Sequence, residues 1–342
     1  MRVAAVIPCY RVGRHILDVV RLALTKVDVV YVIDDCCPDK SGNLVAEHFL
    51  TDRVRVIRHT VNQGVGGAVI SGYLAARQDA VDIVVKLDGD GQMDPDNIPA
   101  LIAPIIANTA DYTKGNRFFN IEYLRHMPPV RVFGNSALSF VNKISSGYWN
   151  IMDPTNGFTA IHSTALREID LDKIAKRYFF ESDMLFRLNV IRAVVRDVPM
   201  ASIYGDEESN LKIGKVLVDF PLRYLKNFFK RFFYNYILRD MNIGTIETLV
   251  GLFLVLAGGT WGIINWISHG MMEQETPAGT VMLATLPIII GSQLLLAAIG
   301  TDIHNVPNEA LQKMNLPRPP HIGVRKPALA GSRETLPEKT GI

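Results

Sequence analysis

Two aspartates separated by one residue, Asp88 and Asp90, stand where an apolar run gives way to a turn. The run is Ile83-Val84-Val85, and the turn reads Asp88-Gly89-Asp90-Gly91-Gln92. Hard divalent cations prefer oxygen ligands, and Mg²⁺ sites often combine one or two carboxylates with the phosphates of a substrate. Open α/β sheets bind ligands beyond the carboxyl ends of their strands. The pattern predicts a metal-assisted site for a phosphate-bearing substrate, although Asp and Gly are also ordinary turn residues.

A second acidic pair follows another apolar run. Asp34 and Asp35 come directly after residues 29–33. In a doubly wound sheet such strand ends meet at one crevice, where an aspartate can bind a ribose or a base edge. The glycine-rich segment 62–68 then opens a helix, and its glycines allow close approach to the backbone. Its spacing is not the dinucleotide-binding fingerprint, so helix–sheet packing is an equal interpretation.

Short apolar runs alternate with amphipathic segments over the first 200 residues. This alternation predicts a mostly parallel sheet with helices on both faces. The expected strands are 3–7, 29–33, 54–57, 83–87 and 110–114. The expected helices are 16–25, 44–50, 65–77 and 96–107. The sequence therefore predicts an α/β fold whose strand ends carry the acidic residues.

Composition restricts the class of protein. The chain has 342 residues with 36 basic and 34 acidic side chains, a balance that gives no signal for binding nucleic acid. Its three cysteines, Cys9, Cys36 and Cys37, match neither a disulfide framework nor a zinc site, which indicates reduced thiols in a cytosolic domain. The apolar part of the N-terminus is too short for a signal peptide and is typical of a first strand.

Two runs without charged residues stand near the C-terminus, at 248–268 and 277–301. Each has the ~20 residues that a helix needs to cross a bilayer, although buried core helices are an alternative. Basic residues flank the pair on both outer sides, whereas the connection contains Glu273 and Glu275 and no Lys or Arg. Because positive charge stays on the cytoplasmic side, both termini are expected in the cytoplasm and the protein in the cell membrane.

A basic and aromatic segment precedes the first of these runs. Its apolar residues at helical spacing are Leu225, Phe228, Phe229, Phe232, Phe233, Tyr236 and Ile237, and its basic residues are Arg223, Lys226, Lys230 and Arg231. Such a helix beside a membrane span is typical of one that lies in the headgroup plane, with packing on the domain core as the alternative. The tail from residue 303 is rich in proline and charge and is predicted to be disordered.

Six short motifs occur in order along the chain. They are Val6-Ile7-Pro8-Cys9-Tyr10, Ile33-Asp34-Asp35, Asn62-Gln63-Gly64-Val65-Gly66-Gly67-Ala68, Asp88-Gly89-Asp90-Gly91-Gln92, Lys114-Gly115-Asn116-Arg117 and Asp153-Pro154-Thr155-Asn156-Gly157-Phe158. With these motifs the chain resembles family 2 glycosyltransferases, and among them dolichyl-phosphate mannose synthases and bacterial polyprenyl-phosphate glycosyltransferases. The resemblance covers residues 1–240 and implies a GT-A-type, Rossmann-like mixed sheet, and the two apolar runs suit the membrane-anchored members.

The resemblance implies roles for individual residues. Donor binding would fall to Pro8, Tyr10, Asp34, Asp35, Gly64, Asp88 and Gly89, with Lys212 and Lys215 on a loop that closes over the donor. Asp88, Asp90 and Gln92 would hold Mg²⁺ or Mn²⁺ against the donor diphosphate. Candidate catalytic residues are Asp90, Arg117 and Arg131, the two arginines reaching a phosphate, and Glu181 and Asp183, which match an acidic base motif. The chain departs from the family pattern at Arg11-Val12 and at Cys36-Cys37-Pro38.

These interpretations divide the chain into four parts. We expect a cytoplasmic catalytic domain at 1–218, an interfacial helix region at 219–241, a two-helix transmembrane hairpin at 242–302 and a basic, disordered tail at 303–342. The expected activity is that of an inverting, metal-dependent hexosyltransferase, which moves one sugar from a nucleotide diphosphate-sugar to an undecaprenyl or dolichyl phosphate at the cytoplasmic face of the bilayer. The sequence identifies neither the sugar nor the nucleotide, and it leaves open whether the protein is a homo-oligomer.

The expected chemistry is physically reasonable without the resemblance. A bound cation neutralises the charge that develops on a departing diphosphate. A lipid phosphate has a second pKa near ~6, so it is already largely a dianion and needs no strong general base. Transfer to another membrane acceptor and a nucleotide-sugar-binding pseudoenzyme or scaffold remain alternatives. A processive polysaccharide synthase is disfavoured, because none of the three tryptophans follows an arginine.

Overall fold

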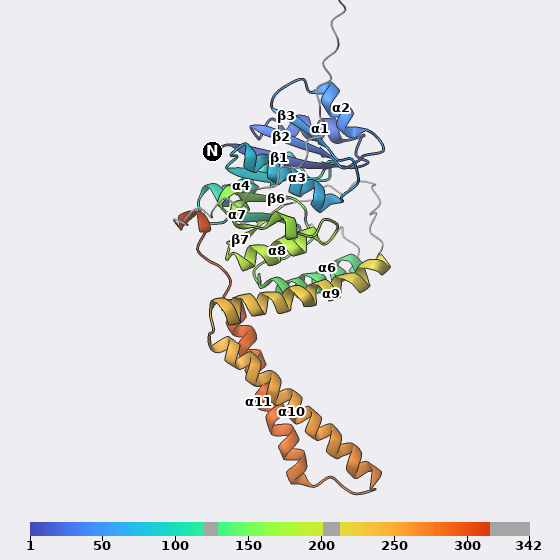
Figure 1. Ribbon diagram of the computed structural model, residues 1–342, viewed down its shortest axis with the longest axis vertical. Helices are drawn as coiled ribbons and strands as arrows, with labels where there is room; N and C mark the ends of the chain where they lie inside the picture. Colours follow the sequence, from blue (N-terminus) through green and yellow to red (C-terminus); the bar gives the residue numbers. More distant parts are fainter. Residues whose placement is uncertain (120–128, 201–212, 315–342) are drawn as a thin grey trace, which may run out of the picture.

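A computed structural model describes residues 1–119, 129–200 and 213–314, and Figure 1 shows the arrangement of their elements. Seven strands form one sheet in the order β3-β2-β1-β4-β6-β5-β7. They are β1 (Val3–Cys9), β2 (Val29–Asp34), β3 (Val54–Arg58), β4 (Ile83–Lys86), β5 (Tyr112–Asn116), β6 (Thr159–His162) and β7 (Val195–Pro199). Only β6 runs antiparallel, to both β4 and β5, among the described strands. The predicted mixed, mostly parallel α/β sheet is confirmed.

Helices cover both faces of the sheet. They are α1 (Ile16–Ala23), α2 (Ser41–His48), α3 (Val65–Gln78), α4 (Ile98–Ile106), α6 (Pro129–Ser146), α7 (Ser163–Glu168), α8 (Phe180–Val190), α9 (Ile213–Phe232), α10 (Ile243–Met271) and α11 (Ala278–His304). Successive side chains of a strand point to opposite faces. Ala4 and Val6 of β1 therefore join the core under α3, α7 and α8, whereas Ala5 and Ile7 join the core under α1 and α4.

Two long helices lie side by side at one end of the domain, α6 and α9 (Figure 1). The residues that α9 and the following π-helix (Phe233–Arg239) turn toward the domain are largely polar, among them Asn227, Arg231 and Asn235. Their outer faces carry large apolar side chains: Phe133 and Phe140 of α6 are exposed, as are Leu222, Leu225, Phe229 and Phe233 of α9 and the π-helix. Helix α9 also exposes the basic side chains of Arg223, Lys226 and Lys230. Helix α6 is not among the helices expected from the sequence.

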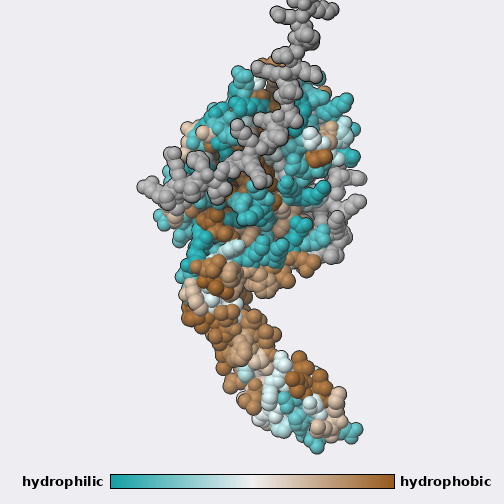
Figure 2. All heavy atoms as spheres, viewed as in Figure 1, coloured by the Kyte–Doolittle hydropathy of each residue, from teal (hydrophilic) through white to brown (hydrophobic). Residues whose placement is uncertain are grey.

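Helices α10 and α11 form an apolar hairpin that projects from the domain (Figures 1 and 2). Both are long and apolar enough to cross a membrane, and only 11 % of the most apolar window of each is buried. The helices approach closely at small residues. A Cβ built on Gly251 would lie 2.9 Å from the carbonyl oxygen of Gly291, and one on Gly258 would lie 2.7 Å from that of Ala284. The low burial of both helices is unlike that of helices in the core of a domain.

The chain returns to the domain after the hairpin. The buried carboxylate of Asp111 accepts hydrogen bonds from the backbone N–H groups of Leu311 (3.0 Å) and Val194 (2.8 Å). The side-chain amide of Gln312 donates to the carbonyl oxygens of Ile105 and Ala110. We call residues 305–314 the strap. The prediction of a disordered tail from residue 303 is wrong for these residues, because Asp111 and the carbonyl oxygens of Ile105, in α4, and Ala110, before β5, hold them.

Candidate functional site

The site lies where the order of the sheet reverses. Strands β1, β2 and β3 follow one another in one direction, and β4 then lies on the other side of β1. All four are parallel, so their carboxyl ends open onto the same crevice between β1 and β4. Ligands of doubly wound sheets bind at such a point. The acidic turn 88–92 follows β4, and the loop 10–15 follows β1, so both flank this crevice.

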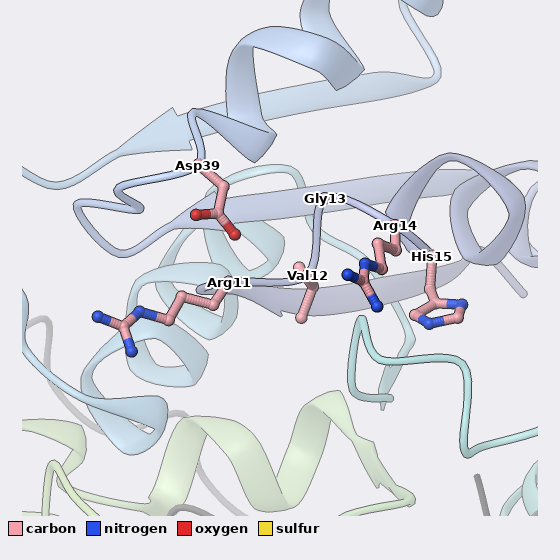
Figure 3. Close-up of a pocket in the computed structure, with 6 residues that line it drawn as sticks. All are labelled: Arg11, Val12, Gly13, Arg14, His15 and Asp39. Carbon is pink, nitrogen blue, oxygen red and sulfur yellow. The ribbon is translucent and has the colours of Figure 1, made fainter. Parts of the chain in front are cut away.

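The acidic turn and the loop after β1 are in contact. A Cβ built on Gly89 would lie 3.1–3.3 Å from side chains of Ile16 and Val12 and from the Pro8 carbonyl oxygen. Gly91 has a φ of +80°, and a Cβ there would lie 3.5 Å from His15. A cavity of about 300 Å³ opens beside this contact (Figure 3). Its lining is Arg11, Val12, Gly13, Arg14, His15 and Asp39.

A buried lysine pairs with the acidic turn. Lys86, the last residue of β4, is 1 % exposed, and its ammonium lies 3.0 Å from Asp88 and 3.2 Å from Glu181 of α8. Burial alone would lower the pKa of Lys86, but the two carboxylates outweigh it and raise that pKa above its usual range. Glu181 is thus brought to the acidic turn, where it balances the charge of Lys86.

The motif 153–158 reaches the same edge because β6 runs antiparallel to β4. The ammonium of buried Lys114 donates to the carbonyl oxygen of Asn156, whose amide donates to Gly115 at 2.8 Å. Arg117 pairs with both oxygens of Asp153, at 2.6 and 2.7 Å. Burial lowers the pKa of Lys114 to about 8 despite the nearby carboxylates. The structure therefore couples the fifth and sixth motifs through charged and hydrogen-bonded pairs.

Asp34 and Asp35 are buried beneath the crevice, and each organises a loop. Asp34 accepts hydrogen bonds from the backbone N–H groups of Cys37 (2.7 Å) and Gly42 (3.1 Å). Asp35 accepts from those of Gln63 and Gly64, both at 2.8 Å, and pairs with His59 at 2.7 Å. Their binding of a nucleotide stays a prediction. These contacts join the second motif to the glycine-rich third motif, because Asp35 accepts hydrogen bonds from Gln63 and Gly64.

The glycine-rich segment packs against the loop before α8. Gly64 has a φ of +86°, and a Cβ on it would lie 2.7 Å from the carbonyl oxygen of Lys176. A Cβ on Gly66 would lie 2.4 Å from that of Ala175. The N–H of Gly67 donates to the Lys176 carbonyl at 3.0 Å. Close packing of backbone on backbone accounts for these glycines, and a contact of Gly64 with the donor stays a prediction.

Comparison with known proteins gives the family. The profile of Glycosyl transferase family 2 matches residues 4–170. A UDP-N-acetylglucosamine–dolichyl-phosphate N-acetylglucosaminyltransferase of Methanococcus voltae is 30 % identical over 233 residues, which are 64 % of this chain and 92 % of that protein. The chain belongs to glycosyl transferase family 2. An undecaprenyl-phosphate mannosyltransferase of Micrococcus luteus is 32 % identical over 208 residues, 59 % of this chain and 84 % of that protein.

Solved structures agree on the fold of this family 2 chain. The glucosyl-3-phosphoglycerate synthase of Mycobacterium tuberculosis, in a crystal structure with Mn²⁺ and UDP-glucose, superposes with a TM-score of 0.51 at 17 % identity. The match covers 66 % of this chain and 78 % of that one. The same enzyme with phosphoglyceric acid gives the same TM-score. The likeness shows a GT-A-type domain in this family 2 chain.

The remaining predicted residues fall in several places. Tyr10 is exposed at the crevice, with the Arg11 guanidinium 5.5 Å from its ring centroid. The N–H of Gln92 donates to Asp90 at 3.0 Å, which shapes the acidic turn. Arg131 lies on α6 and Lys215 on α9, where only the backbone is described, and Lys212 lies outside the described residues.

Asp183 is buried and connects several elements of this family 2 domain. Its carboxylate accepts hydrogen bonds from the Ala175 backbone N–H (2.9 Å) and the Asn227 amide (3.1 Å), and it pairs with Arg187 at 3.0 Å. These contacts join α8 to α9 and to the loop against which the glycines pack. They account for the carboxylate structurally, and a catalytic role for Asp183 stays a prediction.

Sequence reasoning assigned no role to Lys86, Lys114 or Asp153, although all three stand in or beside the quoted motifs. A usable signal existed for Lys86, which ends an otherwise apolar strand. A lysine in that position must be buried, and a buried charge requires a partner of opposite charge. Asp88 lies two residues away, and Glu181 completes the pairing from 95 residues further along the chain.

The donor set suits a hard divalent cation only in part. Among the residues that the structure describes, no three His, Cys, Asp or Glu side chains come close enough to hold a metal ion. Two carboxylates in one turn, one of them partly exposed at Asp88, match the pattern in which substrate phosphates complete the coordination of Mg²⁺. The residues present therefore fit a cation that binds together with a diphosphate.

Proposed function

We propose that the protein transfers one sugar from a nucleotide diphosphate-sugar to a polyprenyl phosphate at the cytoplasmic face of a membrane, with inversion at the anomeric carbon. The meeting of the acidic turn with the loop after β1, on a domain that carries an apolar hairpin, is the observation behind it. Relatives at 30 and 32 % identity act on dolichyl phosphate and undecaprenyl phosphate, as their names state.

Asp88 and Asp90 are the residues that would hold Mg²⁺ or Mn²⁺ together with the donor diphosphate. When bound, the cation would neutralise the charge of the departing nucleotide. Lys86 lies beneath Asp88 and keeps the two carboxylates of Asp88 and Glu181 from repelling each other. The loop after β1, with exposed Tyr10 and the adjoining cavity, faces the same crevice and is the proposed place of the nucleotide.

The acceptor oxygen would displace the nucleotide diphosphate directly: its bond to the anomeric carbon forms as the bond to the donor phosphate breaks. A phosphate dianion needs no strong base for this step, because its second pKa is near ~6. Glu181 is committed to Lys86 in the described structure, which agrees with a site that lacks a dedicated base. Arg131 and Arg117 are the candidates for holding the acceptor phosphate, since guanidinium groups bind phosphate bidentately, and Arg117 would have to exchange its pair with Asp153 for the phosphate.

The membrane part of the proposal rests on three surfaces. The hairpin helices contain 29 and 27 residues, more than the ~20 that span a bilayer. The outer faces of α6 and α9 expose aromatic and aliphatic side chains, which suits helices lying at the headgroup level. Both ends of the hairpin adjoin the domain, which supports placing both on the cytoplasmic side (Figure 1).

The test is transfer by the full-length protein in detergent. We would supply undecaprenyl phosphate, Mg²⁺ or Mn²⁺, and a panel of radiolabelled nucleotide-sugars, and measure label in the lipid extract. One labelled glycolipid that disappears with EDTA and with Asp90→Ala is the expected result. Asp18→Asn, a change at an exposed aspartate of α1, is the matched control and should keep full activity.

Three outcomes would contradict the proposal. Absence of labelled lipid with every donor, despite measurable nucleotide binding, would favour another acceptor or a binding protein without transferase activity. Undiminished transfer by Asp90→Ala in excess EDTA would exclude the proposed use of a metal. A labelled product with the opposite anomeric configuration from that expected for inversion would exclude direct displacement.

A further inference from the structure

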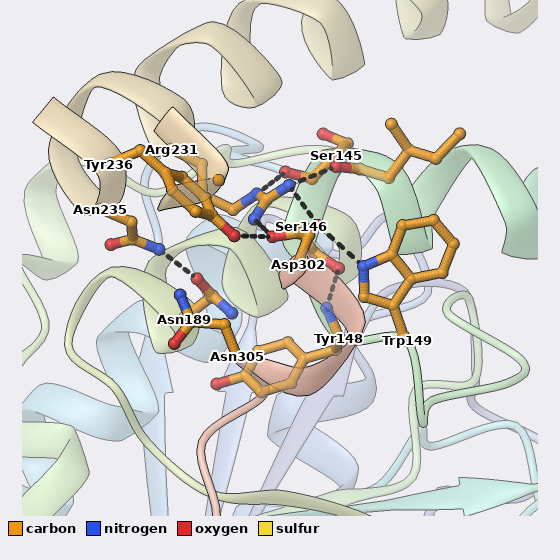
Figure 4. A network of polar contacts seen from close by, with 12 residues as sticks. Ser145, Ser146, Tyr148, Trp149, Asn189, Arg231, Asn235, Tyr236, Asp302 and Asn305 are labelled. Carbon is orange, nitrogen blue, oxygen red and sulfur yellow. Dashed lines mark hydrogen bonds and ion pairs between the residues drawn. The ribbon is translucent and has the colours of Figure 1, made fainter. Parts of the chain in front are cut away.

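Three segments far apart in the chain meet at the domain end of α11 (Figure 4). The carboxylate of Asp302 accepts hydrogen bonds from both terminal nitrogens of Arg231, at 2.6 and 3.0 Å. It also accepts from the Tyr236 hydroxyl at 2.5 Å and the Trp149 indole N–H at 2.8 Å. One side chain of the hairpin thus contacts α9, the π-helix and the segment after α6.

Arg231 extends this junction into α6. Its guanidinium, 3 % exposed, donates to the carbonyl oxygens of Ser145 (3.1 Å) and Ile144 (2.8 Å). The last carbonyls of a helix have no partner within the helix, so Arg231 caps the C-terminal end of α6. Gly147 leaves room for it, because a Cβ there would lie 2.6 Å from the guanidinium. Asp302 supplies the opposite charge that this buried cation requires.

The same region is fastened to α8. The amide of Asn235, in the π-helix, donates to the side-chain oxygen of Asn189 on α8 at 2.7 Å, and both residues are buried. Arg192, just after α8, donates to the carbonyl oxygen of Asn305, three residues beyond Asp302. The hairpin therefore connects to α6, which carries Arg131, and to α8, which carries Glu181.

A helix transmits a displacement from one end to the other. With 18 residues, α6 is about 27 Å long. Its C-terminal end is held at Arg231 and Asp302, while its first turn carries Arg131. A tilt of the hairpin would therefore move the proposed phosphate-binding end of α6 relative to the acidic turn.

We propose that Asp302 is a positioning residue, which fixes the angle of the α10–α11 hairpin relative to α6 and α8 so that a lipid-borne phosphate meets the site at a set depth. It touches neither donor nor acceptor and acts through Arg231. The inference rests on the proposed function for its catalytic consequence, and on the contacts in Figure 4 for its structural one.

The first measurement is the distance between the domain and the tip of the hairpin. Full-length protein in nanodiscs would carry spin labels at two exposed positions, Arg196→Cys on β7 and Gln274→Cys between α10 and α11, with exposed Cys36 changed to Ser. Asp302→Asn keeps the shape of the side chain and removes its charge. We expect a narrow distribution of distances in the parent and a broad or shifted one in Asp302→Asn.

The second measurement separates positioning from folding. In the same nanodiscs, Asp302→Asn should raise KM for polyprenyl phosphate by about tenfold, because small misplacements of a reacting group are costly, and leave KM for the nucleotide-sugar unchanged. Trp149→Phe, which removes one hydrogen bond and leaves the ion pair, should fold normally and give a smaller change in the same direction. Asp240→Asn, at an exposed aspartate before α10, should change neither constant.

Each result decides a separate point. An unchanged distance distribution in Asp302→Asn would overturn the inference, and so would a broadened one with KM for the lipid unchanged. A proportional rise in both Michaelis constants, or a loss of folded protein in Trp149→Phe, would indicate a merely structural role. If the parent transfers no sugar to polyprenyl phosphate, the proposed function fails, while the distances still decide whether Asp302 fixes the hairpin.

Discussion

Lys86 and Asp88, two residues apart at the end of β4, form an ion pair of 3.0 Å in which the lysine is almost completely buried. Glu181 approaches the same ammonium from α8. The charge of the first acidic residue of the turn is therefore already partly neutralised by an internal cation. A further cation that binds at the turn would share the Asp88 carboxylate with Lys86.

Removal of that internal cation should destabilise the domain. Lys86→Met leaves Asp88 and Glu181 close together without a counter-charge, and breaking a buried pair of this kind costs about 3 kcal/mol. The measurement is chemical unfolding of the full-length protein in detergent. Lys26→Met, which removes a partly exposed lysine paired with Asp96, is the control. An equal effect of the two substitutions would show that the buried ammonium contributes little.

The second prediction concerns Asp35. Asp35→Ala deprives two backbone N–H groups, on Gln63 and Gly64, of their buried acceptor, and it unpairs His59. Loss of hydrogen bonds to a charged group should lower the free energy of unfolding by about 3 kcal/mol. Amide hydrogen exchange should rise in residues 62–67. If Asp35→Ala instead keeps its stability and loses nucleotide affinity, the side chain serves the donor and not the loop.

A third prediction is a dependence on pH. Burial raises the pKa of Asp197 to about 7, above the ordinary value of 3.8. An acid with a raised pKa in the folded state stabilises the fold at low pH, and this contribution is lost as the pH rises through about 7. The free energy of unfolding of Asp197→Asn, relative to that of wild type, should therefore be about 2 kcal/mol higher at pH 7.5 than at pH 5. Thermal unfolding at both pH values measures this.

The opposite trend for Asp197 has a clear meaning. If wild type gains stability over Asp197→Asn as the pH rises, the carboxylate is ionised in the folded state and pairs electrostatically with Lys114. The exposed variant Asp18→Asn should show no difference between the two pH values.

The fourth prediction concerns the hairpin. Gly251→Val places a branched side chain where a Cβ would already lie 2.9 Å from the Gly291 carbonyl oxygen, so α10 and α11 must separate. Overpacking of this kind costs about 2 kcal/mol, and the melting temperature in detergent should fall. Gly259→Val makes the same change in the same helix at a position with no neighbouring atom within 4 Å. Equal melting temperatures for the two variants would contradict close packing of the hairpin.

Local patterns in the sequence predicted what local forces determine. The first four strands, the acidic turn after β4 and the two apolar helices follow from runs of side chains that the chain shows directly. Strand β6 escaped prediction, since it has four residues and includes Thr159 and His162. Strand β7 was missed as well, because Arg196 and Asp197 interrupt its apolar residues.

Contacts between distant parts of the chain were not predictable from one sequence. The pairing of Lys86 with Glu181 and of Arg117 with Asp153 depends on how β6 and α8 return to the crevice. Helix α6 turns polar residues such as Ser139 and Asn142 inward and phenylalanines outward. An amphipathic pattern usually predicts that the apolar face packs on the domain core. In α6 the apolar face is directed away from the domain.

The strap has a consequence for how the protein is assembled. Asp111, directly before β5, accepts hydrogen bonds from the N–H groups of Leu311 and Gln312, which the ribosome adds only after both hairpin helices. The segment that leads into β5 is therefore completed by residues that follow the hairpin. Synthesis of both hairpin helices must therefore precede completion of this part of the domain, and a fragment that stops before α10 would leave the Asp111 carboxylate short of two donors. The sheet domain is in this sense complete only in a chain that includes the apolar hairpin and the strap behind it.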